Sequence, residues 1–362
     1  MSETSNADGD ASFAIAVCAN GAEGQVKSAM SAGGWRLAFS RPGLVTAKHD
    51  SPSAALPSDV FIRTSMHSVG QVRGEAVGAF VDPLSKLIDA VPIDRFDDVH
   101  VFPRDRVPVG RFGFEPGPDE VTAAVVDALR ERLGDHTKLD GATWNGVASP
   151  FAKVLDIAMV TPDQWMVGYH RATGPHAMWP GGVQPVSPKY PPISRAYYKA
   201  AEAVAWSGFE LRPNDLAVEI GSAPGGACGF LLEHGLRVIG VDPAEMDPRI
   251  YKHPNYRHLR ARGGDVPRRE YAGAKWLLVD SNVRPEPTLS TVENVVRHRD
   301  VPIEGALVTL KIGAYDNAGV IDRCVDRVRG WELEGKRVDT VEVKQLARNK
   351  VEVCLAIGFE AG

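Results

Sequence analysis

Residues 216–243, LAVEIGSAPGGACGFLLEHGLRVIGVDP, combine a glycine-rich turn with acidic residues in a pattern that could hold a nucleoside-bearing ligand. The apolar runs on either side of the turn predict two strands, with a short helix between them. Glycines let the backbone bend sharply and approach a ligand closely. Asp242 ends the second strand, where its carboxylate could accept hydrogen bonds from ribose hydroxyls. The turn residues expected to contact the ligand are Gly221, Ala223, Pro224, Gly225 and Gly226.

The chemical character of the turn favours a cationic ligand over a dinucleotide. Its spacing differs from the Gly-x-Gly-x-x-Gly fingerprint that dinucleotide-binding enzymes use for a pyrophosphate. Glu219, just before the turn, adds negative charge. S-adenosylmethionine has a sulfonium, an amino group and a ribose, so we expect it as the cofactor. The alternatives are a nicotinamide cofactor, and a turn that only connects two elements.

Four more polar residues are predicted to converge at the edge of the sheet that carries this turn. Asp280 and Lys311 end apolar strands, and Glu352 begins the last strand. Parallel strands end at one edge, where an antiparallel last strand would begin. Lys199 lies in a helix before the first strand. A lysine held neutral by its surroundings can act as a base, with acids and a second lysine to orient it. Each residue also has a simpler explanation: a helix cap, a lysine reaching solvent, or an exposed strand position.

The pattern acid-x-Gly-x-x-Pro-Gly-Gly, followed by a helix, a strand and Asp, resembles motif I of the FtsJ-type ribose methyltransferases. The resemblance implies a Lys–Asp–Lys–Glu tetrad, onto which Lys199, Asp280, Lys311 and Glu352 map. Lys311 would be the base, Asp280 would also adjoin the cofactor, and Glu352 would organise the site. Asp265 matches the place of an acid near the adenine, although it could be a plain turn residue.

The resemblance extends, over about residues 165–362, to the RlmM-like 23S rRNA 2′-O-ribose methyltransferases. QWMVGYHRATGPHAMWPGGV, SRAYYKAAEAV and QLARNKVEVCLAI carry it. It implies a THUMP-containing RNA-binding region before the catalytic domain, and large-subunit rRNA as the substrate. There are three departures. Ala196 stands where the family commonly has Ser, IGAYDN follows Lys311 in place of Leu-Pro, and Val351 replaces an acid. They affect the choice of target nucleotide more than the reaction.

The order of predicted elements indicates two domains. Residues 1–10 are expected to be disordered, and residues 11–178 read as an α+β region, THUMP-like or ferredoxin-like. The proline-rich segment 179–193 is expected to be a linker, because proline cannot sit inside a helix or a central strand. Strands then alternate with helices over residues 194–362. That rhythm predicts an α/β, Rossmann-like methyltransferase domain with a mostly parallel, seven-stranded sheet and an antiparallel C-terminal hairpin.

Composition narrows the class of protein and of partner. A net charge of −5 over 362 residues argues against coating nucleic acid by bulk charge. Four scattered cysteines predict neither a disulfide framework nor a metal site, and no apolar run is long enough for a membrane span, so a cytoplasmic protein is expected. The sequence leaves the oligomeric state open. A local basic cluster could still bind RNA, or be merely solvated: Lys252, Arg257, Arg260, Arg262, Arg268 and Arg269, interleaved with Tyr251 and Tyr256.

Three classes of function fit these features. The first is S-adenosylmethionine-dependent 2′-O-methylation of RNA ribose. The second is methylation of a small molecule or a protein, which needs the cofactor turn but neither the tetrad nor an RNA-binding half. The third is a non-catalytic RNA-binding protein that has kept the fold.

Overall fold

A computed structural model describes residues 12–362, so the expected disordered start lies outside the described residues. The chain divides into two compact units at Pro185–Val186, inside the segment predicted to be a linker. The first part of that segment is not a linker, because Trp179 and Val183 are buried in the first unit. Gly181 and Gly182 have positive φ there and pack closely on neighbouring side chains, which lets the proline-containing segment turn within the unit.

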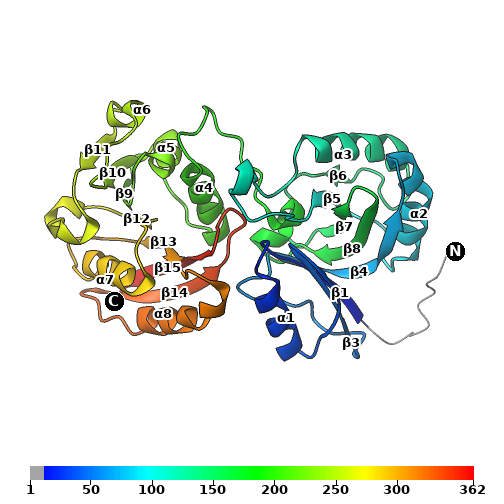
Figure 1. The fold of residues 1–362 in the computed structure, drawn as a ribbon. Coiled ribbons are helices and arrows are strands. Elements are labelled where there is room, and N and C mark those ends of the chain that lie inside the picture. The colour runs from blue at the N-terminus through cyan, green and yellow to red at the C-terminus, as the bar shows by residue number, and fades with distance from the viewer. Residues whose placement is uncertain (1–11) are drawn as a thin grey trace. The chain divides into compact units, whose positions relative to one another are not determined.

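The first unit contains one eight-stranded sheet (Figure 1). Its order is β2-β3-β1-β4-β8-β7-β5-β6, and neighbours are antiparallel except that β5 runs parallel to β6 and β7. A single ferredoxin-like unit, β-α-β-β-α-β, accounts for only four strands and does not describe the whole sheet. The strands are β1 (Ser12–Val17), β2 (Arg36–Arg41), β3 (Leu44–His49), β4 (Thr64–Arg73), β5 (Asp98–Pro103), β6 (Thr143–Trp144), β7 (Lys153–Thr161) and β8 (Gln164–Arg171).

Helices α2 and α3 pack together and against this sheet, which gives the unit an α+β core. Phe80 of α2 stacks on Trp165 of β8 with ring centroids 3.7 Å apart, at the centre of the apolar cluster. Burial of such large side chains is the main favourable contribution to folding. The helices are α1 (Glu23–Ala32), α2 (Val77–Ala90) and α3 (Glu120–Leu133), with short 3₁₀ turns η1 (Arg111–Gly113), η2 (Pro175–Met178) and η3 (Pro180–Gly182).

The second unit is built on a seven-stranded mixed sheet with the order β11-β10-β9-β12-β13-β15-β14. Strands β9 to β13 are parallel, and β15 runs antiparallel to both β13 and β14. The chain moves outward from β9 to β11 and then returns to β12, so the switch point lies between β9 and β12. The strands are β9 (Leu216–Ile220), β10 (Arg237–Val241), β11 (Tyr256–Leu259), β12 (Trp276–Val279), β13 (Gly305–Lys311), β14 (Lys336–Lys344) and β15 (Glu352–Ala361).

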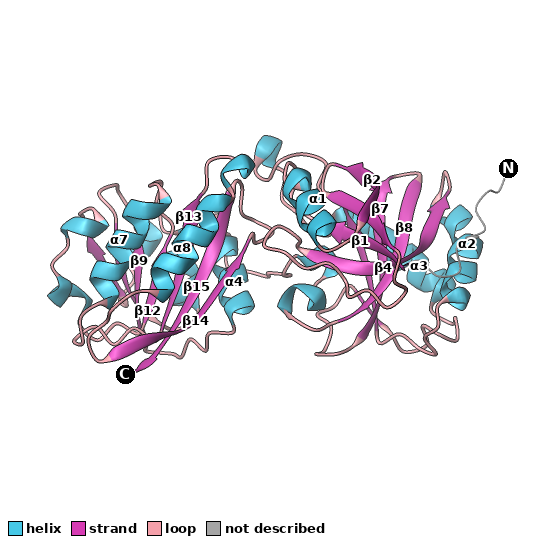
Figure 2. Cartoon of the chain, turned by 90° about the horizontal axis from the view of Figure 1, so that it is seen from below, coloured by secondary structure: helices cyan, strands magenta, loops and turns pink. Residues whose placement is uncertain are grey.

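Helices cover both faces of this second sheet (Figures 1 and 2). Helix α4 packs on α5 at one face, and α7 packs on α8 at the other. Helix α7 begins earlier than its apolar pattern suggests, with Pro285 in its first turn, where proline is tolerated. The helices are α4 (Ala196–Ser207), α5 (Gly226–Glu233), α6 (Pro248–Tyr251), α7 (Pro285–Val296) and α8 (Gly319–Arg329), with 3₁₀ turns η4 (Gly263–Asp265), η5 (Arg268–Tyr271) and η6 (Tyr315–Asn317).

Candidate functional site

The four polar residues predicted to converge do meet at the carboxyl edge of the second sheet. Lys311 ends β13 and Glu352 begins β15, and the two are direct partners in the antiparallel register. Asp280 follows the last residue of β12, and Lys199 reaches the edge from the first half of α4. Residues from four distant parts of the chain are therefore brought together because strand ends share an edge.

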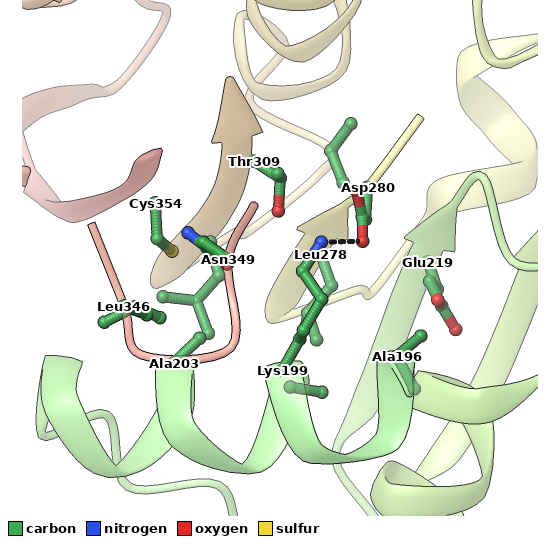
Figure 3. A pocket seen from close by; sticks show the side chains of 14 residues that line it. Ala196, Lys199, Ala203, Glu219, Leu278, Asp280, Thr309, Leu346, Asn349 and Cys354 are labelled. Atoms are coloured by element: carbon green, nitrogen blue, oxygen red, sulfur yellow. Dashed lines mark hydrogen bonds and ion pairs between the residues drawn. The ribbon is translucent and has the colours of Figure 1, made fainter. Parts of the chain in front are cut away.

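These residues form a closed ring in which positive and negative charges alternate. Lys199 Nζ lies 2.6 Å from Asp280 Oδ2 and 2.6 Å from Glu352 Oε1. Lys311 Nζ lies 3.0 Å from Asp280 Oδ1 and also contacts Glu352 Oε2. Figure 3 shows the Lys199 side chain pointing from α4 to Asp280. Each carboxylate thus bridges two ammonium groups, which offsets the cost of partly burying four charges.

The electrostatics of the ring differ from the neutral lysine expected from the sequence. Burial disfavours the Lys311 ammonium, but Asp280 and Glu352 outweigh burial and raise the Lys311 pKa above its usual value. Burial likewise opposes the Asp280 and Glu352 carboxylates, yet the lysines hold the pKa of both acids below the usual range. Lys311 is therefore an ammonium in this state, because the neighbouring acids stabilise its charge more than burial opposes it.

The glycine turn lies at the switch point, and its Gly221 packs directly against the backbone of Asp280, one of the four residues of the ring. Gly221 has φ +84°, and a Cβ there would lie 2.5 Å from the Asp280 backbone oxygen. Only glycine fits both the conformation and the space. The backbone N–H of Ala223 donates to Asp242 Oδ2, so Asp242 also holds the turn in place. Gly225 and Gly226 continue the turn into α5, following Pro224.

A cavity of about 560 Å³ opens beside the turn, with Gly221, Ala223, Asp242 and Asp280 in its wall. Asp242 keeps free lone pairs there, because each carboxylate oxygen accepts one backbone hydrogen bond: Oδ2 from Ala223 N and Oδ1 from Ala244 N. A cavity of this size, with a strand-end acid and a close-approaching glycine, fits an adenosine group. The residues of the chain therefore match the requirements of a nucleoside-bearing cofactor.

Glu219 adjoins the ring through a second, smaller cavity that Lys199 and Asp280 also line. Its side chain is buried, and the Cys228 thiol donates to Glu219 Oε2 over 2.7 Å. Burial raises the pKa of Glu219 to about 8. The carboxyl is consequently neutral at pH 7 and would gain its charge more easily beside a cation.

Asp265 is exposed at the end of η4, just after Arg262 and Gly263 in the cavity wall, so its expected place near the adenine stays a prediction. One sequence expectation near this cavity is not met. Tyr256 does not stand in the basic cluster as a free ring, because its hydroxyl is buried and its ring covers Gly240. Tyr251 remains available, with 63% of its surface exposed.

The six basic residues of the cluster are all exposed, but half of them are already paired. Arg257 and Arg269 contact Glu270, and Arg260 lies 3.8 Å from Glu245. Within residues 12–362 the other three form no ion pair: Lys252, Arg262 and Arg268. These three are the charges most available to a phosphate.

Glu202 is a residue of the site that the sequence pattern did not single out. It is fully buried on α4 and contacts the loop that leads into Glu352. Its spacing of three from Lys199, on the same helix face, is the signal that could have found it.

Within residues 12–362 no group of three or more His, Cys, Asp or Glu side chains is arranged to hold a metal ion. No helix in that range is long and apolar enough to cross a membrane.

Comparison with known proteins points to one family for the second unit. Residues 192–281 match the family described as FtsJ-like methyltransferase. The chain is 28% identical over 191 residues to the ribosomal RNA large subunit methyltransferase M of Laribacter hongkongensis, covering 51% of this chain and 53% of the relative. It is 29% identical over 186 residues to the protein of that name from Azotobacter vinelandii, covering 49% and 51%. The chain thus spans about half the length of the curated relatives it matches.

Solved structures show weaker likeness. The Methanococcus jannaschii fibrillarin pre-rRNA processing protein has 10% identity and a TM-score of 0.36, over 57% of this chain and 83% of that chain. Likeness this low supports no inference about function. The family match and the sequence relatives, in contrast, agree with the glycine turn and the mixed sheet, and they confirm the resemblance read from motif I. Residues 192–281 match the FtsJ-like methyltransferases, the cofactor is S-adenosylmethionine, and the chain is similar to the RlmM-like rRNA methyltransferases.

Proposed function

We propose that this protein transfers a methyl group from S-adenosylmethionine to a ribose 2′-hydroxyl of large-subunit ribosomal RNA. The observation that carries the proposal is the closed ring of Lys199, Asp280, Lys311 and Glu352 beside the glycine turn. Methylation of a free amine needs little help with a proton, whereas a ribose hydroxyl must lose its proton during attack. A lysine set between two acids supports the second reaction.

In this reaction the 2′-oxygen bonds to the methyl carbon, and the bond from that carbon to sulfur breaks. Lys311 takes the hydroxyl proton, so its ammonium must first release one proton to solvent, which its partly exposed side chain can reach. When bound, the cofactor supplies the methyl group on a sulfonium, whose positive charge lowers the pKa of nearby ammonium groups. Asp280 and Glu352 hold the Lys311 amine in position and then stabilise the ammonium that forms.

The proposal is tested by incubating the protein with ribosomal RNA and methyl-labelled S-adenosylmethionine, then digesting the RNA to nucleosides. The label is expected in a 2′-O-methylnucleoside. Label in a methylated base, or label only in a protein or small-molecule fraction, would replace this reaction with another type of methyl transfer.

We propose that the unpaired basic residues Lys252, Arg262 and Arg268 contact RNA phosphates. Of the three, Arg262 also lines the cofactor cavity, which places this arginine beside the expected cofactor. Arg262→Ala and Arg268→Ala are each expected to weaken RNA binding about 3- to 10-fold at low salt and to reduce the salt slope by about 1. Filter binding across a salt series measures both quantities.

Arg329, an exposed arginine of α8 at the other side of the sheet, provides the matched control. Arg329→Ala removes the same charge and should leave RNA affinity within about twofold of the wild type. Equal effects of all three substitutions would mean that only net charge matters and that the basic surface has no special role.

We also propose that the first unit binds RNA, as the THUMP-containing region does in the RlmM-like methyltransferases that this chain resembles. Burial and then the charges of Arg106 and Arg41 lower the pKa of Arg104, so these three arginines lie near one another. Phe112 is 88% exposed, and the Arg111 guanidinium lies 5.0 Å from its ring centre. Exposed aromatic rings beside arginines are suited to stacking on unpaired bases.

Cofactor affinity is expected to depend on the charge of Glu219. Burial raises the Glu219 pKa to about 8, so the Glu219 carboxyl is neutral below pH 8. The carboxyl therefore has to lose its proton when a cationic ligand binds. Affinity for S-adenosylmethionine should therefore rise from pH 6 to pH 8, by up to about tenfold per pH unit, and then level off. The raised Glu219 pKa has the opposite effect on the stability of the free protein. The folded state holds the Glu219 proton more tightly than the unfolded state does, so the free energy of unfolding falls as the pH rises toward 8. Calorimetric titration at several pH values measures the affinity.

Two controls isolate this effect. Glu219→Gln cannot ionise and should flatten the dependence of affinity on pH. The neutral ligand 5′-methylthioadenosine should show little dependence even with the wild-type protein. A Glu219→Gln variant that kept the full dependence would assign it to another group.

A further inference from the structure

Helix α4 carries, besides Lys199, a buried carboxylate that grips the loop between β14 and β15. Glu202 is completely buried. The backbone N–H of Ala347 donates to Glu202 Oε1 over 2.9 Å, and that of Arg348 donates to Glu202 Oε2 over 3.1 Å. The Arg348 guanidinium lies 3.7 Å from the same oxygen. A side-chain carboxyl that accepts two backbone donors and faces a guanidinium is firmly held, even though it is buried.

Other contacts along the same face of α4 hold the same loop. Arg195 donates to the backbone oxygen of Arg348 over 3.2 Å, and the Arg348 guanidinium lies 5.3 Å from the Tyr198 ring centre. Positions 195, 198 or 199, and 202 recur at helical spacing and so share one face. Figure 3 shows the loop, with Leu346 and Asn349, lying over α4 beside Ala203.

This loop ends where Glu352 enters the ring of charges. Gln345 donates from Nε2 to the backbone oxygen of Lys350 over 2.7 Å, which closes the loop just before β15. Glu352 therefore begins β15 from a short, clamped segment, and its Oε1 lies 2.6 Å from Lys199 Nζ. Helix α4 therefore positions Lys199 directly, and it positions Glu352 through the loop.

We infer that Glu202 is a positioning residue for methyl transfer: by holding Ala347 and Arg348, it sets the distance of Glu352 from Lys199 and Lys311. The expected effect on the rate of methyl transfer rests on the proposed function. The expected effect on the position of Glu352 does not depend on that function. If Glu202 releases the loop, Glu352 withdraws from both lysines. Glu352 then no longer holds the Lys311 amine where a ribose hydroxyl would meet it.

The test uses Glu202→Gln, which keeps the size of the side chain. Its amide nitrogen would face one of the two backbone donors, so one of the two bonds is lost. The first readout needs no substrate: the Glu352 carboxyl is titrated by carbon-13 NMR. The lysines hold the pKa of Glu352 below the usual range in the wild type, and it should rise toward an ordinary value in the variant. An unchanged titration would overturn the inference, whether or not the protein methylates RNA.

The second readout is the single-turnover rate of methyl transfer. Glu202→Gln is expected to slow it by about 10- to 100-fold while the affinity for S-adenosylmethionine stays within about twofold. Val295→Ala, at a buried position of α7, is the control for simple destabilisation. If this control, at an equal loss of Tm, slows transfer as much, the role of Glu202 is structural only. Should Glu202→Gln fail to fold, Arg195→Met removes a milder contact to the same loop and should shift both readouts in the same direction by smaller amounts. Unchanged readouts in a folded Arg195→Met protein would then contradict the inference.

Discussion

Replacement of Lys311 with alanine is expected to lower methyl transfer to RNA by about 10³-fold or more, while S-adenosylmethionine still binds with nearly wild-type affinity. A positioned base contributes about 10²- to 10⁴-fold to a rate. Lys311 does not itself line the cofactor cavity, although its partner Asp280 does. The loss should therefore fall on the chemical step. Single-turnover transfer and calorimetric titration of the cofactor measure the two quantities.

Two further substitutions separate the base from its charge. Lys311→Arg keeps the positive charge between Asp280 and Glu352, but a guanidinium is not deprotonated in proteins, so this variant should also be inactive. Lys275 is the matched control, because its Nζ lies 3.3 Å from Asp215 and 3.2 Å from Glu304, outside the ring. Lys275→Ala should keep its activity. Substantial activity in Lys311→Arg would mean that the position supplies only charge.

Replacement of Gly221 with alanine is expected to lower both cofactor affinity and the rate of methyl transfer, the rate by about 10²-fold. The new Cβ would stand 2.5 Å from the Asp280 backbone oxygen, and backbone atoms cannot rotate away as a side chain can. Either the turn or the end of β12 must move. One change would thus disturb the cofactor cavity and the ring together. Calorimetry and single-turnover kinetics report on the two parts.

The control for Gly221→Ala is Gly273→Ala. Gly273 has φ +77°, nearly that of Gly221, but a Cβ there meets no atom within 4 Å. It carries the backbone strain alone, roughly 1 kcal/mol, without the collision. Gly273→Ala should keep cofactor binding and activity. If the two variants behave alike, the close approach of the turn to Asp280 is not important.

The ring of charged residues was predictable because the end of each strand can be recognised in the sequence. Apolar runs stop at Asp280 and at Lys311, and the rule that parallel strands share an edge brings these ends together. The same reasoning predicts the position of Glu352 from an antiparallel last strand, and β15 is antiparallel to β13. The parallel strands of the second unit follow from the alternation of strands and helices for a related reason: each crossover returns the chain to the edge where the next strand begins.

Other features depend on contacts that no local pattern encodes. The first unit has mostly antiparallel strands, whose partners are not fixed by their own sequences, so its order could not be derived. Tyr256 lies in a basic stretch, but its ring turns inward because Gly240 of the neighbouring strand leaves space for it. The charge of Lys311 was misjudged because it depends on how two acids and burial compete, which is a matter of distances. Glu202 was missed because its partners are backbone N–H groups of a distant loop.

The most direct test of the central claim, ribose 2′-O-methylation by the ring of Lys199, Asp280, Lys311 and Glu352, is a map of 2′-O-methyl groups in total cellular RNA. A 2′-O-methyl group protects the neighbouring phosphodiester from alkali, so each modified site appears as a gap in the cleavage ladder. Cells that lack the protein would be compared with cells complemented by the wild type or by Lys311→Arg. We expect one gap in large-subunit rRNA that requires the wild type and that Lys311→Arg does not restore. A map that is identical in all three cells, or a gap restored by Lys311→Arg, would contradict the account.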